Sequence, residues 1–257
     1  MTAPIARVFS SLTVAAMTAA CGAGYYEIPL ETPIRPKIDV SGFERILVAG
    51  FIAGGTEDFD GNIETTRLLR SQLRSQSDMR VIDSDVLPLM EVATESRVTS
   101  DSTAEGEAPS VPEPIMEDDD LVPYEHLFAD AEYWRRIGEE YQQPLIVTGT
   151  VMFGPQERSG VVQRDREVYD SLGRRSVVPV RTYMERKGFV LKPRFVFIDG
   201  RTGAVLLSEN FREEVLYNAN QMSPALSSYF ELMDRLLPSF LSTLSTQTIQ
   251  GTRVLLQ

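Results

Sequence analysis

The acidic residues of this chain are concentrated in one stretch. The 257 residues carry a net charge of −12, from 25 Lys and Arg against 37 Asp and Glu. Residues 85–125 contain twelve acids and one base, Arg97, so this stretch alone carries −11. It is rich in Ser, Thr, Pro and Ala, and such a segment buries too little apolar surface to offset the entropy of ordering. We therefore expect a disordered insertion at about residues 94–121, with the folded body built from the nearly neutral remainder.

The simplest role for this insertion is a solvated spacer, and a tether for calcium or for a basic partner is the alternative. The overall negative charge also disfavours nucleic-acid binding, because affinity for phosphate comes from clustered cations. Apolar residues make up 42% of the chain and charged residues 24%, which is ordinary for a globular protein that can bury a core.

The composition restricts the possible chemistry. With one Cys and one His, the chain forms no internal disulfide and lacks the residues for most His-dependent catalysis and metal binding. The glycines Gly50, Gly54 and Gly55 lack the spacing of a phosphate-binding loop. Residues 58–62 lack the length and the closing Glu of a calcium loop. There is no G-x-S-x-G motif. We expect no cofactor, no metal and no enzymatic activity.

The first twenty residues have the pattern of an export signal. Arg7 precedes an apolar stretch at residues 8–17, and small residues follow immediately before Cys21. The apolar stretch is too short to span a bilayer, which needs about 20 residues. We predict a signal peptide at residues 1–20. Residues 21–37 contain three prolines and are predicted to form an extended tether.

Small residues followed by a Cys resemble the lipobox of bacterial lipoproteins, in which that Cys becomes the lipidated first residue of the mature chain. Cys21 is the only thiol, and it stands where such a protein requires it. The resemblance implies lipidation of Cys21, and several acyl chains would make membrane attachment effectively permanent. Gly22, rather than Asp, follows the Cys. In that family this implies delivery to the periplasmic side of the outer membrane.

The body is predicted to begin with a strand, a helix and a second strand. Residues 45–52 form a continuous apolar run that is typical of a strand buried on both faces. Apolar positions at helical spacing follow from Ile63, and Asp60 or Asn62 can cap this helix. Residues 79–83 are expected to form the second strand.

Beyond the insertion, the pattern predicts a helix at 131–141, a buried strand at 145–151, and hairpins with turns at 171–174 and 199–203. A long amphipathic helix follows, with Ser223 as its cap and a kink at Pro238. A short strand at 253–256 closes the chain.

The sequence therefore predicts one α/β (α+β) domain at residues 38–257, with helices layered on a mixed sheet. Its order is β-α-β-α-β, followed by antiparallel hairpins and a long C-terminal amphipathic helix. Residues 45–83, 134–151 and 195–208 together resemble envelope lipoproteins of the curli-secretion-channel type and activator lipoproteins of penicillin-binding proteins. They also resemble the amino-terminal domain of the Tol-system propeller protein. The resemblance implies an anticodon-binding-like α/β domain in the bacterial envelope.

The hairpin at about residues 156–187 carries eight bases against five acids. Both rows of its side chains contain charged residues, so neither row would tolerate lipid. We predict a solvated arm that is either inert or docks a partner. The candidate contact residues are Arg164, Arg166, Arg174, Arg175 and Arg181.

We expect a non-enzymatic lipoprotein, held to the membrane by its lipid anchor, that acts as an adaptor or an assembly or regulatory factor for another envelope protein. One alternative is a subunit of an oligomeric export assembly, which implies a homo-oligomer. Another is a periplasmic ligand-binding or hydrolytic domain, which implies a deep pocket with convergent buried carboxylates.

Overall fold

The computed structural model describes residues 25–100, 114–218, 221 and 223–256. The chain divides into two compact units. The larger unit, which we call the body, spans residues 37–245. The smaller unit combines the segments that flank the body, residues 1–36 and 246–257. Cys21 and the predicted export signal lie outside the described residues.

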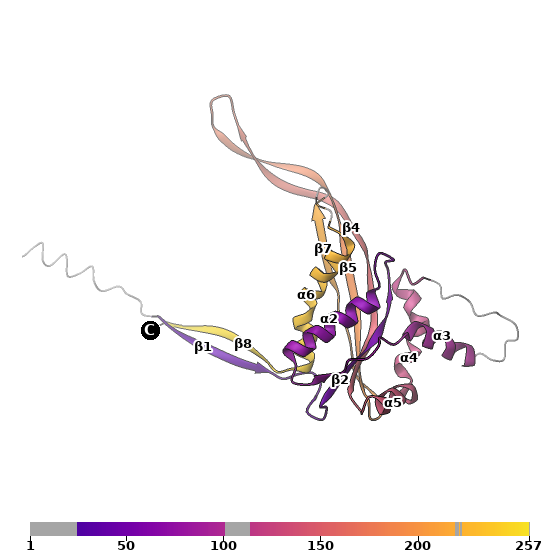
Figure 1. The fold of residues 1–257 in the computed structure, drawn as a ribbon. Coiled ribbons are helices and arrows are strands. Elements are labelled where there is room, and N and C mark those ends of the chain that lie inside the picture. The colour runs from indigo at the N-terminus through magenta and orange to yellow at the C-terminus, as the bar shows by residue number, and fades with distance from the viewer. Residues whose placement is uncertain (1–24, 101–113, 219–220, 222, 257) are drawn as a thin grey trace, which may run out of the picture. The chain divides into compact units, whose positions relative to one another are not determined.

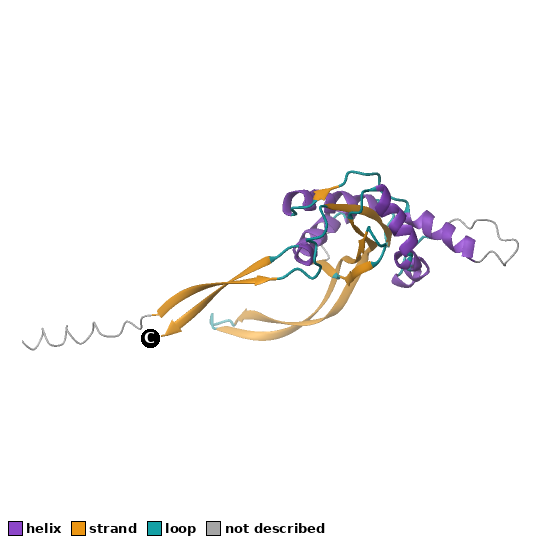
Figure 2. Cartoon of the chain, turned by 90° about the horizontal axis from the view of Figure 1, so that it is seen from below, coloured by secondary structure: helices purple, strands orange, loops and turns teal. Residues whose placement is uncertain are grey.

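The smaller unit is a two-stranded ribbon. Strand β1 (Tyr25–Ile34) pairs antiparallel with β8 (Gln247–Leu256) along its full length (Figure 2). This corrects two expectations, because the proline-containing segment is a strand and the C-terminal strand pairs with it instead of closing the body. Pro29 and Pro33 are an even number of residues apart, so both missing N–H groups lie on the same edge of β1. Proline is tolerated where that edge is the outer one, and the ladder to β8 stays continuous.

The body is built on a mixed sheet, which confirms the predicted fold class. Its strands run in the order β3-β2-β4-β5-β6, and β7 also pairs with β5. Strand β2 lies between β3 and β4 and is parallel to both, whereas β5 is antiparallel to β4, β6 and β7. The bounds are β2 (Arg45–Gly54), β3 (Arg80–Val81), β4 (Leu145–Tyr169), β5 (Arg175–Asp199), β6 (Val205–Asn210) and β7 (Glu213–Asn218).

Helices cover both faces of this sheet. On one side lie α2 (Gly61–Gln76) and α6 (Ala225–Leu244) (Figure 1). The other side carries α3 (Leu89–Ser100), the 3₁₀ helix η1 (Asp118–Tyr124), α4 (His126–Ala129) and α5 (Ala131–Glu140) (Figure 1). Each side has its own apolar core, one around Phe195 and Phe240 and the other around Trp134 and Ile146.

Residues close in sequence determine where helices α2 and α6 begin. Asp60 is the N-cap of α2, and its Oδ1 accepts the N–H of Ile63 at 3.0 Å. The other candidate cap, Asn62, instead accepts the backbone N–H of Phe51 at 2.7 Å and so ties the helix to β2. Helix α6 begins one residue later than predicted, with Pro224 at its N-cap, and it continues through Pro238 without a break.

The structure describes both ends of the predicted acidic insertion. Helix α3 continues to Ser100, and the chain is described again from residue 114. Ile115 and Leu121 are buried, and the carbonyl of Ile115 accepts the N–H of Gly55 at 2.8 Å. The expectation of disorder was therefore wrong at residues 94–100, which belong to α3, and at residues 114–121, where Ile115 and Leu121 pack into the core. Residues 101–113 of the predicted insertion lie outside the described residues.

Candidate functional site

The hairpin formed by β4 and β5 extends beyond the helices that cover the rest of the sheet (Figures 1 and 2). Strand β4 is buried at residues 145–153 and exposed from residue 157 to its end. Its neighbour β2 pairs with it only as far as Met152, and β7 pairs with β5 only from Arg186 onward. Between these points and the turn, the two strands pair only with one another among the described residues. We call residues 156–187 the distal hairpin.

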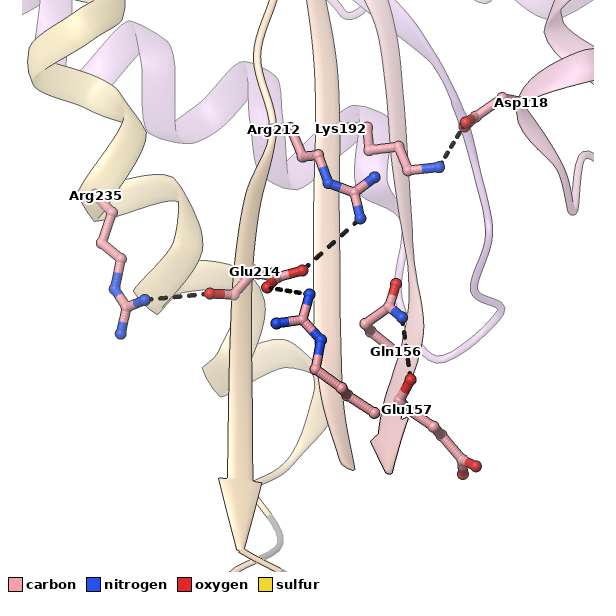
Figure 3. A network of polar contacts seen from close by, with 8 residues as sticks. Asp118, Gln156, Glu157, Lys192, Arg212, Glu214 and Arg235 are labelled. Carbon is pink, nitrogen blue, oxygen red and sulfur yellow. Dashed lines mark hydrogen bonds and ion pairs between the residues drawn. The ribbon is translucent and has the colours of Figure 1, made fainter. Parts of the chain in front are cut away.

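The root of the distal hairpin is held by ring packing and by an ion-pair network. Phe153 stacks on Phe189 with ring centroids 5.0 Å apart, where the two strands leave the core. Glu214 of β7 binds Arg158 at 3.1 Å (Figure 3). Arg212 lies 3.8 Å from the same carboxylate. These contacts fix where the hairpin leaves the body.

The tight turn at the tip fixes the register of the two strands. Gly173 has a φ of +74°, a conformation that glycine adopts at little cost, and its N–H donates to the carbonyl of Asp170 at 2.9 Å. The carboxylate of Asp170 accepts the N–H groups of Leu172 and Arg174, each at 2.9 Å. The backbone and side-chain hydrogen bonds from Arg174 hold the pKa of Asp170 below its usual value. The turn thereby sets Tyr169 opposite Arg175.

This register separates the charges onto two faces. Cross-strand partners share a face, and in this ladder odd residues pair with odd and even with even. Within the paired ladder, at residues 158–168 and 176–186, the even-numbered face contains cations and no acid. We call this the cationic face. Its cations are Arg158, Arg164, Arg166 and Arg186, and its apolar residues are Val162, Val168, Val178, Val180 and Met184.

The opposite face is close to electrically neutral. Its four acids are Glu157, Asp165, Glu167 and Glu185, and its three bases are Arg175, Arg181 and Lys187. Lys187 lies 2.9 Å from Glu157 and 3.4 Å from Glu185. The hydrogen bond to Glu157 is the main cause that raises the pKa of Lys187. Most charges on this face therefore already have a partner within the hairpin.

The five predicted arginines do not form one cluster. Arg164 and Arg166 lie together on the cationic face, and neither forms an ion pair with any residue that the structure describes. Arg174 pairs with Asp170 at the turn, at 2.7 Å. Arg175 pairs with Glu167, and Arg181 lies on the opposite face beside Gln163.

Sequence reasoning did not include the remaining members of the cationic face. Arg158 and Arg186 were counted among the bases of the hairpin but not as candidates, and Val178 and Val180 were not considered. Counting alternate positions outward from the turn on both strands would have placed all of them on one face. The missing information was the register, which the turn at Gly173 sets.

A second feature lies beside the hairpin root, where an open hollow of about 620 Å³ is found. Glu117, Asp118 and Asp119 of the segment around η1 line one side of it. Asp118 pairs with Lys192 of β5 at 2.5 Å (Figure 3). Part of the acidic stretch therefore contributes an ion pair that holds η1 against the sheet.

Other candidate groups are engaged in the fold. Asp199 is the one buried carboxylate among the described residues, and it binds Arg201 at 3.0 Å in the turn after β5. The ring of His126 contacts the carbonyl of Pro123 at 2.9 Å. Within the described ranges, no group of three or more His, Cys, Asp or Glu could hold a metal ion.

In the same ranges, no helix has both the length and the apolarity needed to cross a bilayer.

Several solved structures are similar in fold to this chain, and two of them are described here. No family model matches the sequence, and no curated protein matches it. Lipoprotein GNA1162 from Neisseria meningitidis is similar over 79% of this chain and 99% of its own, with 9% identity and a TM-score of 0.34. A neuraminyllactose-binding hemagglutinin homologue from Helicobacter pylori is similar over 82% of this chain and 88% of its own, with 10% identity and a TM-score of 0.30. At these TM-scores, neither likeness assigns a family or a function to this chain.

Proposed function

We propose that this protein is a non-enzymatic adaptor of the bacterial envelope, anchored by a lipid on Cys21 to the periplasmic side of the outer membrane. Its body would be an anticodon-binding-like α/β domain, as in the lipoproteins that the sequence resembles. The distal hairpin would dock another envelope protein. The observation that carries the proposal is the cationic face, where Arg164 and Arg166 lie among exposed valines and face no acid.

The chemistry of this face indicates what it would bind. A guanidinium presents a rigid fork of donors that matches a carboxylate in two parallel hydrogen bonds. Val162, Val168 and Val178 are about two-fifths exposed, which leaves apolar area for a partner to cover. A partner surface that carries carboxylates beside apolar groups would satisfy both requirements.

The charge pattern of the cationic face is complementary to a partner that carries carboxylates. Arg164 and Arg166 are two positions apart on the same face of one strand, so their charges repel. Within the paired ladder, no acid of this face offsets that repulsion. A partner carboxylate placed between the two guanidinium groups would remove the repulsion and add two charge-assisted hydrogen bonds.

The backbone of the hairpin offers a second means of recognition. Both strand edges are unpaired beyond Met152 and before Arg186, so a partner strand can add to either edge. Every second side chain of that partner strand would then project on the same side of the sheet as the cationic face and lie beside it. The rigid root at Phe153 and Glu214 gives such a partner a fixed platform.

The test is site-specific photocrosslinking in the native envelope. A photoreactive residue at Val178, on the cationic face, is expected to give one dominant crosslinked protein. The neighbouring position Val177 lies on the opposite face and serves as the matched control, with a much weaker product expected.

Variants that reverse the charge of arginines complete the crosslinking experiment. The double variant Arg164→Glu and Arg166→Glu is expected to abolish the crosslink at Val178, because the partner carboxylates would then be repelled. Arg181→Glu reverses a charge on the opposite face and is expected to leave the crosslink intact. Equal crosslinking from both faces, a product containing only copies of this chain, or insensitivity to the double reversal would overturn the proposal.

A further inference from the structure

The ribbon of β1 and β8 has two chemically different faces. Ile28, Leu30 and Ile34 occupy alternate positions of β1, so they share one face, and their side chains are 41%, 47% and 44% exposed. Arg253 lies opposite Ile28 and therefore belongs to the same face. We call these four residues the apolar face of the ribbon. Glu31 lies on the other face.

Such a ribbon lacks what normally stabilises a pair of strands. Two strands alone bury little surface and are at best marginally stable in water. The apolar face leaves three large aliphatic side chains exposed in a row. A surface that covered them would stabilise the ribbon and remove its apolar area from water.

The prolines of β1 disfavour addition of a further strand. Pro29 and Pro33 lack backbone N–H groups on the same edge of β1. Proline is compatible with a continuous ladder when that edge is the outer one, and a further strand would then lack those donors. Recognition at β1 therefore favours the apolar face over that edge. This feature favours a smooth apolar surface as the occupant over a partner strand.

We propose that the apolar face of the ribbon lies on the surface of the lipid bilayer, with Ile28, Leu30 and Ile34 at the boundary between headgroups and acyl chains. The proposal rests on the lipid anchor of the proposed function. Strand β1 begins four residues after Cys21. At about 3.5 Å per residue, Ile28 lies at most about 25 Å along the chain from that Cys. A lipid on Cys21 would thus hold the face within reach of the bilayer.

The charges of the ribbon have the matching arrangement. Arg253 is on the apolar face, where its long stem can lie along the aliphatic side chains while its guanidinium binds an anionic headgroup. Glu31 is on the opposite face, away from that surface. A cation beside apolar residues and an acid on the far side are typical of segments that lie in a membrane interface.

The test uses the mature acylated protein in vesicles of phosphatidylethanolamine and phosphatidylglycerol. Leu30→Cys and Glu31→Cys are each labelled with an environment-sensitive fluorophore. Cys21 is the only natural Cys, so acylation leaves the new thiol as the one labelling site. A nitroxide-bearing phospholipid is expected to quench the label at position 30 severalfold more than the label at position 31, and aqueous iodide is expected to show the reverse order.

Other quenching or labelling results would contradict the ribbon proposal or the lipid anchor. Equal quenching of the two labels by lipid would overturn the proposal. Protection of the position-30 label from both quenchers would overturn it in favour of a second copy of the chain covering the face. Two labels per chain would show that Cys21 is free and that the anchor of the proposed function fails. The same pair would then be measured in a Cys21→Ser chain mixed with these vesicles, where lipid quenching at position 30 would retain the ribbon proposal and its absence would refute it.

Discussion

The β4–β5 hairpin has one continuous backbone ladder but two parts with different surroundings. We call the part inside the body, which includes residues 145–153, the root, and the part beyond it is the distal hairpin. The pairing is continuous from the Leu145–Asp199 pair to the Tyr169–Arg175 pair at the turn. At the root, residues 145–153 are buried and both faces of β4 and β5 contribute to apolar cores. In the distal part, residues 157–169 are all exposed. Packing in the core constrains the size and polarity of side chains at the root. The exposed side chains of the distal part have no such constraint from the fold.

The largest expected effect comes from opening a cavity at the root. Phe195 is fully buried, and its ring packs 4.8 Å from that of Phe240 and 5.8 Å from that of Phe51. Phe195→Ala is expected to lower the free energy of unfolding by about 3–5 kcal/mol, because it loses apolar burial and leaves a cavity. The measurement is urea unfolding followed by far-UV circular dichroism.

The matched change in the distal part is Tyr183→Ala, whose side chain is 65% exposed. Its expected effect is within about 0.5 kcal/mol, since an exposed side chain removes little area from water. Comparable losses from the two variants would contradict the distinction between the two parts of the hairpin.

A smaller and local effect is expected at the turn. Gly173→Ala places a side chain at a φ of +74°, which costs about 1–2 kcal/mol even though no atom lies within 4 Å of the new Cβ. The cost falls on the tip, so amide hydrogen exchange at residues 163–181 is expected to accelerate while the urea midpoint of the body stays unchanged. Gly160→Ala is the control, because its Cβ also meets no atom and its φ is not in the left-handed region. A shift of the urea midpoint by Gly173→Ala would show that the tip unfolds together with the body.

The smallest effect is a pH dependence confined to the tip. The pKa of Asp170 is lowered by its hydrogen bonds with Arg174, so the ionised carboxylate stabilises the folded turn. This contribution is present above the usual pKa of Asp and is lost as the pH falls through the lowered value in the folded turn. Amide exchange and chemical shifts at Leu172 and Arg174 are expected to follow this titration. Asp170→Asn removes the titrating group, and persistence of the transition in that variant would assign it to another residue.

Much of the body could be predicted from local pattern. The apolar run of β2, the capped helix after it and the amphipathic α6 were all expected near their observed bounds. These elements bury their own apolar residues, so their periodicity is visible in the chain itself. The second strand was predicted at five residues but pairs over two, at Arg80 and Val81. β2 continues to Gly54, but the chain leaves the ladder after Val81, and local pattern does not encode this departure.

Less of the candidate site than of the body could be predicted from the sequence. The hairpin and its turn were predicted, but the five candidate arginines divide among the turn and two faces. Arg164 and Arg166 share the cationic face, whereas Arg181 lies on the other. A shift of one residue in register would exchange the faces, so a single misplaced turn residue changes the composition of the whole surface.

Local sequence pattern was enough to predict β2, the helix after it, the long hairpin, the amphipathic α6 and the concentration of acid in one stretch. It did not predict α3 or β7, and it left the cap of α2 open between Asp60 and Asn62. Tertiary structure was needed to show that β1 pairs with β8, that helices cover both faces of the sheet, and that Asp118 of the acidic stretch pairs with Lys192. The physical reason is the range of the interactions. Caps, turns and amphipathic periods act between near neighbours in the chain, whereas these pairings join segments whose complementarity appears only when folding brings them together.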